Sequence, residues 1–367
     1  MIDRGASRSP LNGEHSMIMP ENAAVKDSWW VELEDLLARF AGRFGRVEPR
    51  RRAGEYVRGL LAPVARKTGS GLASAAGHAS PDGMHKLLNS SRWDADAVRD
   101  DLRGYAVEHL GAADAVLVLR EVSFTKKGTR SVGVQRQHSP ATGRTENCQI
   151  GVFLTYASSR GTTVLDRELF LPRSWVDDPD RRTAAAVPTG RTYATRTQLA
   201  QAMVGRALTS DVPFSWVSGD EEQVRDPRFR RWLESRRVPY VLALPRPREG
   251  AVRRWTAVPD PDREWTVLAR HPSRHAGWER WMLARRPLAH REDVSHYLGF
   301  CPAGTRTTDL VRVAEIRDRV HARLRAGTDQ VGLEDYEVRQ YHAWYRHMTL
   351  AMAAYSFLAA MADANPM

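Results

Sequence analysis

Basic side chains are the residues of this chain whose chemistry most directly suggests a partner. Three consecutive arginines begin an expected helix near residue 50, a second basic pair follows that helix, and two lysines stand in a later turn. The 367 residues carry 55 Lys and Arg against 44 Asp and Glu, a formal net charge of +11. Such an excess favours polyanions, above all nucleic acid, although arginines also solvate the outside of many proteins. We expect double-stranded DNA as a partner, bound through Arg50, Arg51, Arg52, Arg66, Lys67, Lys126 and Lys127.

The cysteines do not form a metal-binding pattern. Cys148 and Cys301 are far apart, and neither has a second Cys or His at the spacing of a zinc site. We expect neither a disulfide nor a metal site, and the sparse use of Cys suits a reducing cytoplasm. No apolar run reaches the length of about 18 residues that a membrane span needs. The polar start of the chain does not resemble a signal peptide. These features favour a cytoplasmic protein without cofactors.

Asp220 is the carboxylate whose position is the most suggestive. It follows the apolar segment VPFSWVSG, which predicts a buried strand, and so stands at the end of that strand. An aspartate there serves equally as the cap of a following helix, as an ion-pair partner or as a metal ligand.

Helical periodicity dominates the first third of the chain. SWWVELEDLLARFAGRF places apolar residues at helical spacing, and Asp94 begins a further expected helix. We expect a disordered tail over residues 1–25 and a small helical DNA-binding domain over residues 26–109.

From Ala115 the pattern changes to that of a sheet. AVLVLREVSF is a continuous apolar run, typical of a strand buried on both faces. SVGVQRQHS and NCQIGVFLTYAS follow after short turns, which predicts an antiparallel meander. A strand–helix–strand unit over residues 195–243 favours parallel pairing.

The expected fold class is α/β, with a mixed sheet and flanking helices. We expect its core in residues 110–243 and 302–360, the second part being helical. Residues 244–301 are rich in Pro, Arg and Trp, and we expect them to form a β-rich insertion. Its expected short strands are WTAVPD, EWTVLAR and RWMLARR.

Long collinear segments resemble bacterial insertion-sequence transposases of the DDE superfamily, whose catalytic fold is ribonuclease-H-like. The resemblance runs from about Trp29 to about Leu358. The segments that carry it include PDGMHKLLNSSRWDADAVRDDLRGYAVEHLG, FTKKGTRSVGVQRQHSPATGRTENCQIGVFLTYAS, DRELFLPRSW, VPFSWVSGDE, VPYVLALPR and VGLEDYEVRQYHAWYRHMTLAM. The resemblance implies three carboxylates that hold two divalent metals for DNA cleavage and strand transfer.

Two of these three carboxylates are replaced. The family's first aspartate closes the strand before the Lys-Lys-Gly turn, and here that position is Arg120. The second survives as Asp220, although the Tyr-Gly pair that follows it in the family is here Gln223-Val224. The third is a glutamate about ten residues before a Gly-Leu pair, and counting back from Gly332-Leu333 places His321 there. We therefore expect no bound metal and no strand-transfer activity.

Three functions stay open for such a chain. The first is a domesticated DNA-binding or regulatory protein, with a homodimer left open as its assembly. The second is a repurposed enzyme, in which Arg120, Asp220 and His321 perform non-nuclease chemistry with help from Glu121, His138 or Cys148. The third is a structural or interaction partner. In each case we expect an Arg120–Asp220 salt bridge, with His321 close by and titrating near neutral pH.

Overall fold

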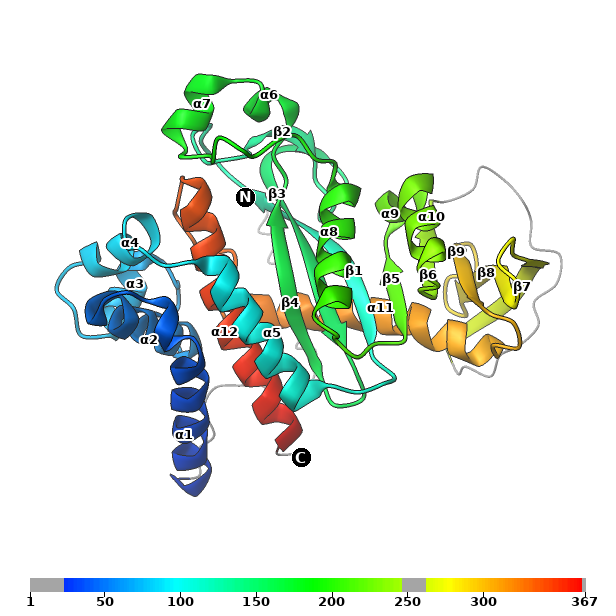
Figure 1. The fold of residues 1–367 in the computed structure, drawn as a ribbon, viewed down its shortest axis with the longest axis horizontal. Coiled ribbons are helices and arrows are strands. Elements are labelled where there is room, and N and C mark those ends of the chain that lie inside the picture. The colour runs from blue at the N-terminus through cyan, green and yellow to red at the C-terminus, as the bar shows by residue number, and fades with distance from the viewer. Residues whose placement is uncertain (1–22, 246–261, 365–367) are drawn as a thin grey trace, which may run out of the picture.

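The computed structural model describes residues 23–245 and 262–364, in which the strands form one mixed sheet (Figure 1). The strand order is β2-β3-β1-β5-β6-β9-β8-β7, and β4 also pairs with β3. β5 and β6 run parallel to β1, whereas β3 and β9 pair antiparallel with their neighbours. The expected mixed α/β class is confirmed. The strands are β1 (Val116–Thr125), β2 (Gln135–His138), β3 (Thr145–Ala157), β4 (Thr162–Leu169), β5 (Trp216–Gly219), β6 (Tyr240–Leu244), β7 (Arg263–Pro272), β8 (Trp278–Pro287) and β9 (Ser295–Pro302).

Helices cover both faces of this sheet. In Figure 1, α8 crosses in front of the strands and α11 passes behind them, whereas α12 is seen beside them, partly covered by α5. The N-terminal helices gather on the side of α12. The helices are α1 (Ala23–Arg39), α2 (Val47–Leu61), α3 (Gly69–Ala75), α4 (Asp82–Asn89), α5 (Ala95–Leu110), α6 (Arg173–Val176), α7 (Pro179–Ala184), α8 (Arg196–Thr209), α9 (Glu221–Arg225), α10 (Pro227–Ser235), α11 (Thr307–Gln330) and α12 (Tyr341–Ala364).

β1 is the central strand that its apolar run predicts. Val116 and Val118 pack into the hydrophobic cluster that contains α12, whereas Leu117 and Leu119 pack into the cluster around α8. All four side chains are fully buried. Successive side chains of a strand point to opposite faces, so Arg120 continues the α12 side and Glu121 continues the α8 side.

Two sequence-based expectations about the strands need correction. The segment SVGVQRQHS contains β2, which is limited to Gln135–His138. β2 pairs with the edge of β3 opposite to β1, so β1, β2 and β3 are not a simple meander. The segment SHYLGFCP forms β9, which we did not expect, and β9 pairs with β6. The strands of the expected insertion thereby continue the central sheet. The expected strand WTAVPD lies outside the described residues.

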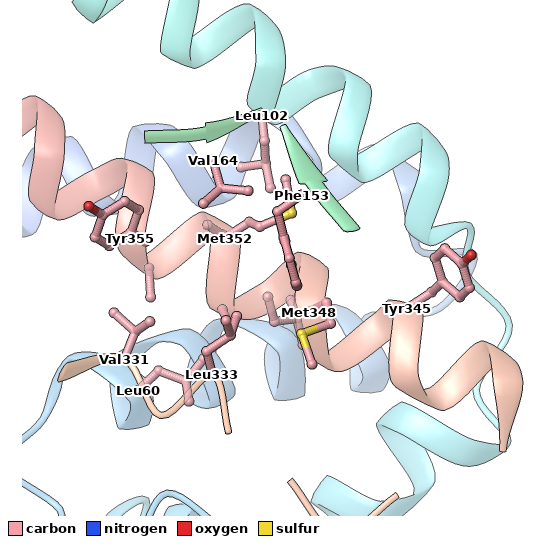
Figure 2. Packing of buried hydrophobic residues seen from close by; sticks show 14 of the residues in the cluster. Leu60, Leu102, Phe153, Val164, Val331, Leu333, Tyr345, Met348, Met352 and Tyr355 are labelled. Carbon is pink, nitrogen blue, oxygen red and sulfur yellow. The ribbon is translucent and has the colours of Figure 1, made fainter. Parts of the chain in front are cut away.

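α12 is the element on which the N-terminal helices and the sheet meet. Its neighbours come from α2, α5, β3 and β4 and from the loop that follows α11, and Figure 2 shows them around Met348 and Met352. The labelled neighbours include Leu60, Leu102, Phe153, Val164, Val331 and Leu333. Although α12 is long and largely buried, none of the described helices is apolar enough over a sufficient length to cross a membrane.

Buried polar contacts fasten the N-terminal helices to α12. Tyr56 of α2 shares a 2.8 Å hydrogen bond with Nδ1 of His347, whose side chain is fully buried. Burial lowers the pKa of His347 to about 4, so its ring is neutral at physiological pH. Arg346 donates to the carbonyls of Leu88 and Trp93 at 2.8 and 3.2 Å. These bonds satisfy backbone groups that would otherwise be buried without partners.

Candidate functional site

Arg120 lies on β1, and Asp220 directly follows β5, the parallel neighbour of β1. β1 and β5 pair in the register Val116–Trp216 to Val118–Ser218, and this register places Arg120 level with Asp220. Asp220 directly follows β5 and precedes α9, so it occupies the cap position of that helix. Its backbone N–H donates to the side chain of the buried Gln223 at 2.9 Å. Gln223 therefore has a local structural role at a position where the transposase pattern differs.

His321 approaches the same point from α11. Nη1 of Arg120 donates to the backbone carbonyl of His321 at 3.2 Å, and Nε2 of His321 lies 3.7 Å from Oδ2 of Asp220. The three positions expected from the resemblance thus converge in space. Arg120 contacts α11, whereas Glu121 pairs at 2.7 Å with Arg196 of α8 on the opposite face, as strand alternation predicts.

The cation that pairs with Asp220 is Arg317, and this corrects the expected Arg120–Asp220 bridge. Arg317 lies one helical turn before His321, and its Nε donates to Oδ1 of Asp220 at 2.7 Å. A second guanidinium nitrogen of Arg317 also donates to this oxygen. Residues four apart on a helix share a face, so the position of His321 already indicated that Arg317 would reach the site.

The ion pairing continues beyond Asp220. Nη1 of Arg317 lies 2.8 Å from Asp318, and Asp318 also accepts a hydrogen bond from Arg285 of β8. Asp220, Arg317, Asp318 and Arg285 therefore form a chain of alternating charges, which we call the ion-pair ladder. Asp318 thus connects α11 to β8 through Arg285.

Burial sets the protonation of the two titratable neighbours of the ladder. It lowers the pKa of His321 to about 4. The positive charges of Arg317 and Arg120 lower this pKa further, whereas the negative charge of Asp220 raises it. His321 is therefore neutral at pH 7, so the expected titration near neutral pH is wrong. Burial raises the pKa of Glu121 to about 7, opposed by Arg196 and reinforced by Glu222 and Asp220.

Comparison with known proteins assigns this geometry to a family. A profile described as "DDE superfamily endonuclease" matches residues 39–291, well over half of the chain. The chain belongs to the DDE superfamily. It is also 24% identical over 187 residues to the "Probable transposase for insertion sequence element IS701" of Microchaete diplosiphon. That match covers 51% of this chain and 46% of the relative, so the chain spans less than half of that protein. The expected resemblance to an insertion-sequence transposase, with a ribonuclease-H-like sheet, is confirmed.

The donor set of this DDE-superfamily chain does not fit the two hard cations that the family implies. Such cations require several carboxylate oxygens. Asp220 is the one carboxylate left at the three positions, and its Oδ1 already accepts from Arg317. Among the residues that the structure describes, no group of three or more His, Cys, Asp or Glu is arranged to hold a metal ion.

The proposed helpers Cys148 and His138 lie away from this point. Cys148 is opposite Thr125, five residues beyond Arg120 along β1, roughly 17 Å at strand spacing. It is buried, and burial raises the pKa of its thiol, which disfavours the thiolate. His138 pairs still farther along, opposite Thr145.

The expected DNA-binding residues differ in their accessibility. Arg50, Arg51, Arg66 and Lys127 are exposed. Arg52 is half-buried and pairs with Glu55 at 2.8 Å.

The other two expected DNA-binding cations are engaged inside the protein. Lys67 is buried and donates to the carbonyls of Leu60 and Gln330, so it holds the chain together and does not face DNA. Lys126 lies 3.6 Å above the ring of Tyr336, and burial lowers its pKa to about 8. Gln330 and Tyr336 are distant in sequence from the lysines that they contact, which is why the sequence did not reveal these internal contacts.

Proposed function

We propose that this DDE-superfamily chain is a domesticated DNA-binding protein that does not perform metal-dependent strand transfer. The observation that carries the proposal is the ion pair of Asp220 with Arg317. A guanidinium there occupies the oxygen that a metal would need, and Arg120 and His321 stand at the other two ligand positions.

Electrostatics favours the ion-pair ladder over a metal. A divalent cation at Asp220 would be repelled by Arg317 and Arg120, and at about 4 Å even a single pair of unit charges interacts by about 4 kcal/mol near a protein surface. To bind the metal, the chain would also have to break the Asp220–Arg317 pair in a partly buried place. Both costs oppose the two-metal mechanism.

DNA binding is supported by the charge and by the exposed cations of the N-terminal part. Arg50, Arg51 and Arg66 are accessible, and Lys127 adds a cation at the turn after β1. The buried contacts of Arg346 and His347 hold the N-terminal helices to α12, which packs on the sheet. We therefore propose that these helices and the core present their cations to duplex phosphates as one body.

The test combines binding and cleavage on the same duplex DNA. Without divalent metal, fluorescence anisotropy should show binding that weakens steeply between about 50 mM and about 200 mM salt. With Mg²⁺ or Mn²⁺, supercoiled DNA should stay intact. Metal-dependent nicking that disappears in Asp220→Ala would refute the proposed loss of activity, and failure to bind duplex at low salt would refute the DNA-binding role.

A repurposed enzyme is the second candidate, and one observation favours it. Arg317 and Arg285 of the ladder also line a cavity of about 470 Å³, together with Arg225, His296 and Tyr297. His296 is 8% exposed, and its Nδ1 has no hydrogen-bond partner. A cavity that combines a neutral imidazole with guanidinium groups could hold an organic anion. Screening carboxylate and phosphate compounds by thermal shift, with Arg285→Ala as the comparison, tests this candidate; no stabilisation by any compound would reject it.

A further inference from the structure

A second cavity lies where α5, α8 and α10 meet, away from the ion-pair ladder. Its volume is about 500 Å³, and its wall includes Ala202, Gly205, Arg206, Leu208 and Thr209 of α8. The opposite end of α8 begins with Arg196, which pairs with Glu121 behind the ladder. At 1.5 Å per residue, Arg196 and Thr209 are roughly 20 Å apart. Figure 1 shows α8 running along the sheet between these two ends.

Four arginines surround one buried aspartate behind this cavity. Arg99, Arg103, Arg167 and Arg206 each place a nitrogen 2.7–3.9 Å from a carboxylate oxygen of Asp166. Asp166 is 1% exposed. We call these five residues the Asp166 cluster. A single carboxylate cannot neutralise four guanidinium groups, so the balance depends on the neighbouring acids.

The neighbouring charges leave an excess of positive charge. Asp96, Asp100 and Glu168 pair with members of the Asp166 cluster, which brings the carboxylates to four against four arginines. Arg191 is a fifth cation, since it pairs with Glu168 at 3.0 Å. Arg236 adds a sixth at the cavity wall, with no carboxylate partner among the described residues. The balance of these groups is therefore two positive charges.

The excess positive charge acts on arginines that line the cavity. Arg103 is 6% exposed, and its Nη2 has no directed hydrogen bond although Asp100 lies 2.8 Å away. Burial lowers the pKa of Arg103, and repulsion from Arg99 and Arg206 lowers it further against the attraction of Asp166 and Asp100. The known contact of Arg236 is with the face of Trp232, at 4.5 Å. These guanidinium groups can donate further hydrogen bonds to an anion.

The ends of the two helices do not account for these cations. Arginines near a helix C-terminus often serve its free carbonyls. Here the carbonyls of Ala207 and Leu208 at the end of α8 accept backbone N–H groups from Val212 and Asp211. Leu233 and Glu234 at the end of α10 are satisfied in the same way by residues 236–238. These helix ends therefore do not need the guanidinium groups of the cavity as donors.

We propose that this cavity binds a phosphate monoester, held by Arg103, Arg206 and Arg236 with the hydroxyl of Ser210. Ser210 already accepts a 2.9 Å hydrogen bond from Arg103 and keeps its own proton to donate. A monoester carries nearly two negative charges at pH 7 and so matches the excess of two, whereas a phosphodiester carries one. The volume exceeds that of a phosphate group, so the ester can carry an organic part such as a nucleoside.

Calorimetry with adenosine 5′-monophosphate, inorganic phosphate and adenosine tests the proposal on the full chain. We expect the two phosphates to bind and adenosine not to bind. Binding should weaken from pH 7.5 to pH 5, because the second proton of a monoester is gained near a pKa of about 6. Arg236→Ala should weaken binding at least about tenfold, since hydrogen bonds to charged groups have this strength.

Arg231→Ala is the matched control, since Arg231 is an exposed arginine of α10, the helix that Arg236 caps, and it does not line the cavity. Equal affinities of the Arg236→Ala and Arg231→Ala variants would overturn the proposal, as would no binding of either phosphate to the wild type. A duplex without terminal phosphates that displaces the nucleotide equally well would also overturn it, because the site would then accept diesters. Replacing Arg50 and Arg51 should leave nucleotide binding unchanged, which separates this site from the proposed DNA-binding role.

Discussion

Arg317 binds Asp220 through two nitrogens that share one carboxylate oxygen. The pair joins the end of β5 to the middle of α11, at the point where the resemblance places a metal between carboxylates. The guanidinium group of Arg317 thus neutralises Asp220, as a bound metal ion would in a DDE enzyme. This relationship determines what each substitution in the site should do.

Removing the guanidinium should destabilise the fold. Arg317→Ala leaves Asp220 and Asp318 without their shared partner, and an uncompensated, partly buried charge costs about 1–3 kcal/mol. Urea unfolding at pH 7 measures the loss. Arg319→Ala, an exposed arginine on the same helix, should change the free energy of unfolding by less than about 0.5 kcal/mol. Equal effects of the two substitutions would show that the ion pair contributes nothing to stability.

Restoring the acidic residues should not restore metal binding while Arg317 is present. We expect Arg120→Asp with His321→Glu to bind Mn²⁺ no better than the wild type, because Oδ1 of Asp220 still accepts from Arg317. Adding Arg317→Leu should create a weak site, measurable by calorimetry, whose heat disappears with Asp220→Asn. Tight binding by the double variant alone would contradict this role of Arg317.

Glu121 should make stability fall as the pH rises. Its folded pKa of about 7 lies above the ordinary value of 4.5, so between these values the folded chain keeps a proton that the unfolded chain loses. The stabilisation by protonated Glu121 is complete below pH 4.5 and lost by about pH 7. Glu121→Gln should therefore gain stability relative to the wild type from pH 4.5 to pH 8, by up to about 3 kcal/mol. Arg196 keeps Glu222 as a partner at 3.3 Å, so the variant leaves no unpaired cation. A constant difference between the two unfolding curves across this range would refute the assignment.

Arg50 and Arg51 should contribute measurably to the salt dependence of DNA binding. If each neutralises one phosphate, replacing both with Ala should lower the slope of log affinity against log salt by about 1.8. Anisotropy with one duplex at several salt concentrations provides this slope. Arg231→Ala serves here too as the control, and an unchanged slope in the double variant would exclude both arginines from the DNA contact.

Lys67 should matter for stability and not for DNA. Lys67→Met removes the donor that two backbone carbonyls share inside the protein, at a cost of about 1–3 kcal/mol for each unsatisfied group. Urea unfolding of the variant and the wild type should show the loss in the free energy of unfolding. The DNA affinity of the folded variant should match that of the wild type. A variant with normal stability and weakened DNA binding would contradict this prediction and would indicate that Lys67 contacts DNA.

The sequence predicted best those features that depend on local pattern. The apolar run of β1, the strand that ends at Asp220 and the cap position of Asp94 are found where expected, since burial and capping depend on neighbouring residues. The resemblance brought Arg120, Asp220 and His321 to one point, because the family topology fixes where those elements meet.

The features that were missed depend on side-chain direction and on long-range pairing. Arg317 displaced Arg120 as the partner of Asp220 because the rotation of α11 about its axis decides which side chain reaches the strand end. The pairing of β9 with β6, and the place of β2 across β3, arise from contacts between distant segments that carry no local signal. The burial of Lys67 has the same origin, since one of its acceptors, Gln330, is 263 residues away.

The packing of α2 and α4 against α12 has a consequence for the order of events during synthesis. From Leu61, at the end of α2, to Tyr341, at the start of α12, the ribosome must add 280 residues, which takes roughly 15–60 s at bacterial elongation rates. Throughout that interval Leu60 lacks the α12 side chains that lie near it in Figure 2. Tyr56 lacks its hydrogen-bond partner His347. We expect the nascent N-terminal helices to be sensitive to protease until α12 emerges, and stalled chains that end before residue 341 would show this directly. α2 is therefore made long before α12 but completes its packing only after α12 has emerged.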